Sequence, residues 1–162
     1  MTKRFLRALY GALHMGRGIR RTVNGRQYRF SAHVARGIPG AIHGMADQWQ
    51  EMVRETTIAF DVGAHIGTYS VLAATQMRPG STIYAFEPSP ETFVILKDTA
   101  RVAMGPARIV PINVAVGDQN AEAAFAANGT ESTNHFAVNG SGSAINVKMV
   151  TLDAFCAAKE IQ

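Results

Sequence analysis

The chain has 162 residues, of which 47% are hydrophobic and 17% are charged. This is enough apolar material for one hydrophobic core but too little length for two ordinary domains, and the charged fraction argues against a disordered or acidic-tail protein. The single cysteine, Cys156, excludes an intrachain disulfide and indicates a reducing compartment. The sequence has no apolar run of about 18 residues and no secretory signal pattern, so we expect a cytoplasmic protein without a transmembrane helix.

The net charge of +4 is concentrated at one end of the chain. Residues 1–58 carry ten Lys or Arg and three Asp or Glu, a charge of +7, whereas residues 59–162 carry six and nine, a charge of −3. Within the basic part, residues 3–21 place apolar side chains at helical spacing with Lys and Arg between them. We expect a short helix that packs on the domain, with peripheral membrane contact as the alternative. No nucleic-acid-binding motif accompanies the basic residues, so no nucleic acid partner is expected.

The rest of the N-terminal part predicts a hairpin and a helix. Residues 22–34 alternate loosely between apolar and polar residues around Asn24-Gly25, a tight-turn signal between two short strands. Residues 45–56 have the spacing of a helix. Its apolar face is expected to hold Met45, Trp49, Met52 and Val53. We therefore interpret residues 1–57 as an N-terminal extension made of a basic helix and a hairpin.

Strands and helices alternate from residue 58 onward. Short apolar runs predict strands at 58–62, 81–86 and 108–116. One helix is expected to end near Met77, and the next to start at Pro90 with Ser89 as its N-cap. The buried face of this second helix is expected to hold Phe93, Leu96, Ala100 and Ala103. The order is a βαβαβ unit, which predicts an α/β fold with a parallel sheet and right-handed crossovers.

We assign residues 58–162 to one domain. The sequence of its last part predicts less regular structure than the βαβαβ unit. Residues 117–144 are rich in Gly, Asn, Ser and Ala and contain one expected antiparallel strand near 123–126. A further strand is expected over 145–150, and a short helix is expected to begin at Thr151.

A loop with two glycines joins the first of these strands to its helix, with the sequence Asp61-Val-Gly63-Ala-His-Ile-Gly67. Glycines at such a junction let the backbone turn sharply and approach a ligand closely. A P-loop is excluded because no Lys follows Gly67. A dinucleotide site is disfavoured because Asp61 stands in the place of its first glycine and would repel a pyrophosphate.

S-adenosylmethionine fits this loop better, because it has no phosphate and carries a sulfonium and an ammonium group. Asp61 favours that cationic methionine end, and backbone N–H groups between Gly63 and Gly67 can meet its carboxylate. A second acid, Glu87, ends the next strand, where a carboxylate can accept hydrogen bonds from both ribose hydroxyls. The two acids and the loop together predict a donor site at the carboxyl ends of the first two strands.

Several blocks of the sequence resemble the motifs of the FkbM-type methyltransferases, in the same order. They are Phe60–Ser70, Ala85–Pro90, Asn113–Asp118 and Val150–Phe155, preceded by the hairpin Val23–Phe30. The resemblance covers roughly residues 22–156, and four blocks in order are far more specific than one. It implies a class I Rossmann-like fold, S-adenosylmethionine as cofactor, and O-methylation of a hydroxyl on a small molecule or glycan, usually a sugar or a secondary metabolite.

The resemblance also assigns residues to the cofactor. The methionine end would be held by Asp61, Gly63 and Gly67, with Ala64 and His65 in the same loop, and the ribose by Glu87. Val116 and Asp118 would lie near the adenine, although Asp118 is equally well explained as a turn residue.

No catalytic residue is assigned by the sequence. His65 has the chemistry of a general base, but its place inside the loop favours a capping or packing role. The other histidines have no ligand spacing with a Cys or a carboxylate, so no metal site is expected. Cys156 is expected to be a buried small hydrophobe rather than a nucleophile.

In the FkbM-type family a strand with a K-x-D-x-E-G motif follows the block at Val150–Phe155, whereas this chain ends at Gln162. The resemblance therefore implies missing C-terminal strands, and we expect a fragment, one half of a split protein or a shortened, non-catalytic relative. An incomplete sheet would favour self-association or a partner chain at its open edge. The alternative class of function is a non-catalytic module that binds a membrane surface or nucleic acid through the basic N-terminal arm.

Overall fold

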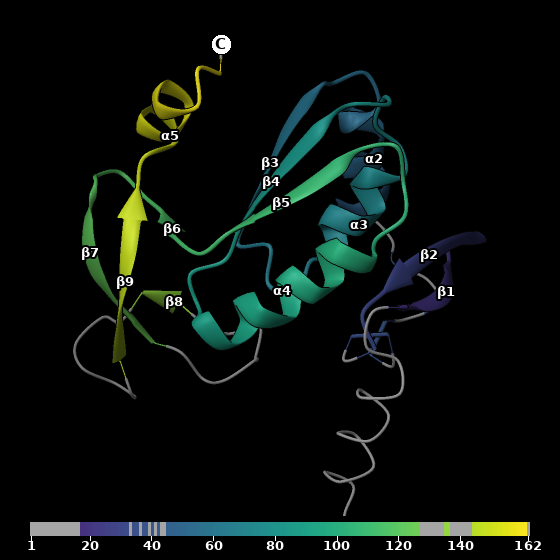
Figure 1. Ribbon diagram of the computed structural model, residues 1–162, viewed down its shortest axis with the longest axis horizontal. Coiled ribbons are helices and arrows are strands. Elements are labelled where there is room, and N and C mark those ends of the chain that lie inside the picture. The colour runs from purple at the N-terminus through teal and green to yellow at the C-terminus, as the bar shows by residue number, and fades with distance from the viewer. Residues whose placement is uncertain are drawn as a thin grey trace, which may run out of the picture.

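The computed structural model describes residues 17–32, 34–35, 37–38, 40, 42, 45–126, 135–136 and 144–161. The strands in this part are β1 (Ile19–Val23), β2 (Arg26–Phe30), β3 (Ile58–Val62), β4 (Thr82–Phe86), β5 (Arg108–Ile112), β6 (Ala115–Val116), β7 (Ala121–Ala126), β8 (His135–Phe136) and β9 (Ala144–Val150). The helices are α2 (Met45–Val53), α3 (Thr68–Ala74), α4 (Pro90–Val102) and α5 (Leu152–Ala158). The expected mixed α/β architecture is confirmed (Figure 1).

A parallel sheet in the order β3-β4-β5 forms the centre of the fold. Asp61 of β3 lies in register with Ala85 of β4, and Phe86 of β4 lies in register with Ile112 of β5. The carboxyl ends of the three strands therefore meet at one edge, which is where parallel α/β sheets bind ligands.

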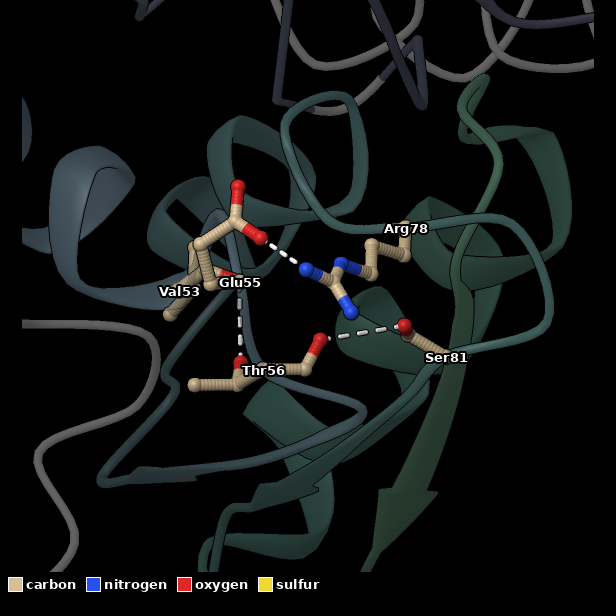
Figure 2. Close-up of polar contacts among 5 residues, drawn as sticks. All are labelled: Val53, Glu55, Thr56, Arg78 and Ser81. Atoms are coloured by element: carbon tan, nitrogen blue, oxygen red, sulfur yellow. Dashed lines mark hydrogen bonds and ion pairs between the residues drawn. The ribbon is translucent and has the colours of Figure 1, made fainter.

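Figure 2 shows the contacts that hold the opposite, amino-terminal ends of β3 and β4 together. Arg78, which precedes β4, forms an ion pair with Glu55, which precedes β3. The Ser81 hydroxyl donates to the Thr56 carbonyl at 3.2 Å, and the Thr56 hydroxyl donates to the Val53 carbonyl at 2.9 Å. These bonds set the start of β4 beside the start of β3, so that the two strands end together.

Helices α3 and α4 cover one face of the sheet, and the hairpin β1-β2 packs against them (Figure 1). The buried side chains of helices and hairpin form one hydrophobic cluster with those of the sheet. Its largest fully buried members include Tyr28, Phe30, Leu72, Ile83 and Leu96. At about 1.5–3 kcal/mol for each fully buried large apolar side chain, this cluster is the main stabilising contact between the elements.

The other face of β3 and β4 is aromatic. Phe155 of α5 lies with its ring centroid 5.0–6.3 Å from those of Phe60, Tyr84 and Phe86, in edge-on geometry. Among the described residues β3 pairs only with β4, so its second edge carries no strand. Val62, at the end of β3, is 51% exposed.

The end of the chain forms a second sheet in the order β6-β9-β7-β8. β9 is parallel to β6 and antiparallel to β7, so the antiparallel strand predicted near 123–126 is confirmed. This sheet has a small core of its own, made of Ala115, Phe125, Val147 and Met149. No helix in the described part of the chain is long and apolar enough to span a bilayer.

The N-terminal prediction is correct for the turn and wrong for the start of the hairpin. Asn24 and Gly25 both have positive φ angles, 47° and 76°, as a two-residue hairpin turn requires. However, Ile19–Val23 already belongs to β1, so the helix predicted over 3–21 does not reach its expected end. Cross-strand pairing with Phe30 overrides the helical spacing there. Residues 1–16 of that prediction lie outside the described residues.

The single strand predicted over 108–116 is in fact two strands. β5 ends at Ile112, and the chain then leaves the first sheet and starts β6 in the second. The break falls at Asn113, whose side chain donates to the backbone carbonyls of Glu87 and Pro88. That side-chain bond ties the end of β5 to the end of β4 at the point where the strand stops.

The apolar faces predicted for two helices are confirmed in part. Val53 and Leu96 are buried, and a further four predicted residues are partly buried against the core: Trp49, Phe93, Ala100 and Ala103. In α2, Met45 and Met52 are each 71% exposed, and the buried positions are Ala46 and Val53. In α4, the N-cap at Ser89 and Pro90 at the first position are confirmed. Its buried face consists of Thr92, Leu96, Thr99 and Val102.

Burial of the two threonines of α4 has a physical reason. The Thr92 and Thr99 hydroxyls donate to the hydroxyls of Ser89 and Ser31, each at 3.2 Å. Because these bonds satisfy the buried hydroxyls, polar residues can occupy positions that an apolar pattern assigns to larger side chains.

We predict that Gly105→Ala destabilises the fold strongly. Gly105 has a φ of 145°, and a Cβ there would lie 2.3 Å from the backbone oxygen of Ala74 at the end of α3. Strain and overpacking together should cost roughly 2–5 kcal/mol in the free energy of unfolding, measured by denaturant titration. Gly80→Ala is the control, because Gly80 also has a positive φ but has nothing within 4 Å of the added atom. Equal losses in the two variants would refute the close approach.

Candidate functional site

The two acids that the sequence singles out lie at the same edge of the parallel sheet. Asp61 is the fourth residue of β3, and Glu87 directly follows β4. The loop between them folds over the end of β4, since the backbone N–H groups of Gly63 and Ala64 both donate to the Phe86 carbonyl, at 3.0 and 2.9 Å. The structure therefore brings together both acids and the loop from Gly63 to Gly67.

The Glu87 carboxylate joins the two loops that leave β3 and β4. Its Oε2 accepts the backbone N–H of His65, and its Oε1 accepts that of Ser89, both at 2.9 Å. The residue is only 4% exposed. Burial raises the pKa of the Glu87 carboxyl above its ordinary value of 4.5, and the two backbone N–H groups act in the opposite direction. Each oxygen keeps a further lone pair, so this carboxylate can still accept hydrogen bonds from a ligand.

Asp61 is held by α3. The Ser70 hydroxyl donates to Asp61 Oδ2 at 2.5 Å, and Ser70 itself is fully buried. Burial raises the pKa of the Asp61 carboxyl above its ordinary value of 3.8, while hydrogen bonds from the side chain and backbone of Ser70 lower it. Ser70 ends the motif Phe60–Ser70, but the motif alone does not predict this role for it. The sequence did contain a signal for this contact. Ser70 carries a hydroxyl in the first turn of the helix that follows the strand bearing Asp61.

The loop conformation leaves room for a ligand on one side only. Gly63, His65 and Gly67 all have positive φ angles, of 76°, 52° and 86°. At Gly67 an added Cβ would lie 2.7 Å from Leu96 Cδ1, so this glycine allows α3 to start against α4. At Gly63 an added Cβ would meet nothing within 4 Å, and the residue is exposed. The open side of the loop is thus the side of Gly63.

Asn113 is a further residue that the sequence reasoning missed. Its Nδ2 donates to the Glu87 and Pro88 carbonyls, at 2.8 and 3.0 Å, and the Glu87 N–H donates to the Ile112 carbonyl at 3.0 Å. The end of β5 therefore fixes the backbone of Glu87. The sequence did contain a signal for this role. Asn113 directly follows the strand that ends at Ile112, and polar residues at that position of a parallel sheet lie at its ligand-binding edge.

Val116 and Asp118 are not joined to this group. Val116 pairs with Val150 in the second sheet, and Asp118 lies in the exposed turn that follows β6. Within the described residues, no hydrogen bond or ion pair links either one to Asp61 or Glu87. Their assignment to an adenine site stays a prediction.

The two carboxylates give the site hydrogen-bond acceptors and negative charge. The buried Glu87 carboxylate and the half-buried Asp61 carboxylate stand beside exposed loop backbone. This arrangement suits hydroxyls and a cationic group rather than a phosphate. Among the residues the structure describes, no three His, Cys, Asp or Glu side chains gather as metal ligands. The groups gathered here can accept hydrogen bonds and attract a positive charge.

Comparison with known proteins identifies the family of this chain. The family model of the methyltransferase FkbM domain matches residues 61–162, more than half of the chain. The chain is 31% identical to the hexuronic acid methyltransferase AglP of Haloferax volcanii over 85 residues, which cover 49% of this chain and 33% of that protein. It is 42% identical to the 31-O-demethyl-FK506 methyltransferase FkbM of Streptomyces tacrolimicus over 48 residues, covering 30% of this chain and 18% of that protein.

The matched stretches thus span about a third or less of these curated relatives. No solved structure matches the chain. The matches confirm the family that the sequence motifs indicate.

We predict that Asp61→Asn changes how stability depends on pH. In the unfolded chain Asp61 ionises near its ordinary pKa of 3.8, whereas burial raises the pKa in the folded protein. Between these two values the folded state keeps a proton that the unfolded state has released, so rising pH lowers the free energy of unfolding. The stability of the wild type minus that of Asp61→Asn should therefore fall as the pH rises above 3.8.

Denaturant titrations across this pH range measure that difference. Asp118→Asn, which removes a carboxylate from an exposed turn, controls for the loss of one negative charge. A difference that stays constant or grows with pH would contradict the burial of Asp61.

Glu87→Gln is expected to lower the free energy of unfolding by about 1–3 kcal/mol, because one of the two backbone N–H groups then faces an amide NH₂ and loses its acceptor. Thermal or denaturant unfolding measures the loss. Glu91→Gln, at an exposed position in the first turn of α4, should cost less than about 1 kcal/mol. Equal effects of both substitutions would refute the role of Glu87 as the link between the loops.

Proposed function

This chain belongs to the FkbM methyltransferase family, and we propose that it binds S-adenosylmethionine at the carboxyl ends of β3 and β4. The observation that supports the proposal most directly is the position of Glu87. This buried carboxylate, at the end of the second parallel strand, is fixed by two backbone N–H groups and retains acceptor capacity. On this proposal β3-β4-β5 is one half of a Rossmann-like sheet.

The residues at this edge fit the groups of S-adenosylmethionine one by one. Glu87 would accept hydrogen bonds from the ribose hydroxyls, and Asp61 would stabilise the positively charged methionine end. The exposed backbone around Gly63 lies on the open side of the loop, where the methionine carboxylate can be met by N–H groups. Val116 and Asp118 are proposed for the adenine on the family resemblance alone.

The proposed reaction is O-methylation. When bound, S-adenosylmethionine would supply the methyl group: the bond from its sulfur to the methyl carbon would break as the bond to the hydroxyl oxygen forms, leaving S-adenosylhomocysteine, and the hydroxyl proton would pass to solvent. The contribution of this chain is to orient the donor, because Asp61 and Glu87 are themselves held by hydrogen bonds. A sugar or secondary-metabolite hydroxyl is proposed as the acceptor, since one relative is named for a hexuronic acid and the other for a 31-O-demethyl-FK506.

Donor binding is the test, because it does not depend on the acceptor. In calorimetric titration, we expect S-adenosylmethionine to bind the 162-residue chain. Asp61→Ala and Glu87→Ala should each raise the Kd by about 10–100-fold. That range corresponds to losing one hydrogen bond to a charged group. Circular dichroism of each variant checks that it is folded.

Glu122→Gln is the matched control, because Glu122 is an exposed carboxylate of the second sheet, opposite Lys148. Its Kd should equal that of the wild type. Failure of the folded wild type to bind, or equal binding by all variants, would overturn the proposed donor site.

A further inference from the structure

The outward face of the β1-β2 hairpin carries two arginines directly opposite each other. Arg20 of β1 is in register with Arg29 of β2. Because side chains alternate along a strand, these two share a face with Thr22 and Gln27. The other face of the hairpin places Val23, Tyr28 and Phe30 in the core. Like charges directly across an antiparallel pair repel, so this register costs stability unless something neutralises it.

Nothing in the described part of the chain neutralises the pair. The ion pairs there join Arg54 to Glu51, Arg78 to Glu55 and Arg101 to Asp98. In the part of the chain that the structure describes, no side-chain hydrogen bond or ion pair involves Arg20, Arg29 or the adjoining, exposed Arg17.

The inner-face arginines of the same hairpin are different, since each is bonded. Arg21 donates to the Ala35 carbonyl and Arg26 to the Gln76 side chain, both at 2.5 Å. The outward guanidinium groups are therefore free to bind an external anion.

This basic face lies far from the carboxyl ends of β3 and β4. A Cβ on Gly18 would lie 2.7 Å from Arg29 Cγ and 2.8 Å from Val102 Cβ, which places Arg29 at the last turn of α4. The first turn of α4 adjoins Glu87 through Ser89. The 13 residues of α4 span roughly 20 Å. An anion on the hairpin is thus separate from the proposed donor site.

The surroundings of the arginine pair favour lipid over nucleic acid. Single-stranded nucleic acids need exposed aromatic side chains for stacking, and the aromatic residues of the hairpin, Tyr28 and Phe30, are buried. The sequence just before the hairpin interleaves Lys3, Arg4 and Arg7 with large apolar residues. Such a mixture suits a bilayer interface, where headgroup phosphates bind the cations and apolar side chains enter the acyl boundary.

We propose that the outward face of the β1-β2 hairpin, through Arg20 and Arg29, docks this protein on an anionic lipid bilayer. The phosphate groups of the lipids would lie between the two guanidinium groups and remove their repulsion. Docking through this face leaves the carboxyl ends of the parallel strands accessible. The proposal does not depend on the proposed methyltransferase activity.

Sedimentation of the full chain with vesicles tests the proposal. Equimolar phosphatidylglycerol–phosphatidylcholine vesicles should bind the wild type, pure phosphatidylcholine vesicles should not, and added salt should weaken the binding. Arg20→Gln/Arg29→Gln should reduce partitioning to the anionic vesicles on the order of tenfold. This variant removes only exposed or half-exposed side chains and relieves a repulsion, and its melting curve confirms that it is folded.

Arg54→Gln/Arg101→Gln is the matched control, because it removes the same charge from arginines that already pair with carboxylates. It should bind the anionic vesicles like the wild type. Equal losses in both double variants would show a net-charge effect and overturn the proposal. Unchanged binding by Arg20→Gln/Arg29→Gln, or binding of the wild type to an oligonucleotide duplex but not to vesicles, would also overturn it.

Discussion

The arrangement of the candidate site depends on one carboxylate. Glu87 follows β4, and its two oxygens accept backbone N–H groups from the loop after β3 and from the start of α4. Because both donors are backbone groups, the carboxylate fixes the path of the chain rather than one side chain. Charge-assisted bonds of this kind are about twice as strong as neutral ones. The loop with Gly63 and Gly67 therefore has a set position relative to the sheet before any ligand binds.

The same bonds explain how two acids can lie close together in a partly buried place. Burial alone favours the protonated forms and raises the pKa of both Asp61 and Glu87. Ser70 and the two backbone N–H groups lower these pKa values in turn, so they favour the charged forms that the proposed donor site needs. Water stabilises the charge of a solvent-exposed acid, whereas here hydrogen-bond donors of the protein do so. Because these donors are fixed, the carboxylates have set orientations.

Local sequence signals could predict the central unit, because short strands, glycine loops and helix caps depend on neighbouring residues. The strand at 58–62, the cap at Ser89 and the turn at Asn24-Gly25 all follow such signals. What the sequence did not reveal depends on distant partners. Thr99 is buried because Ser31 accepts its hydroxyl, and the strand predicted over 108–116 is broken where Asn113 bonds the end of β4. Ser70 was missed as a site residue for the same reason, since its role exists only once α3 stands over Asp61.

β3 connects the candidate site to the least covered part of the fold. It carries Asp61, and in the described part of the chain its second edge has no partner strand. Exposed edge strands usually carry Lys or Pro that blocks further pairing, whereas Ile58–Val62 has neither. Apart from Asp61 its residues are apolar, as in a buried parallel strand. Association at this edge stays a prediction. A strand that paired with β3 in parallel, as β4 does, would have its carboxyl end beside Asp61. Pairing at this edge would therefore change the surroundings of one acid of the proposed donor site.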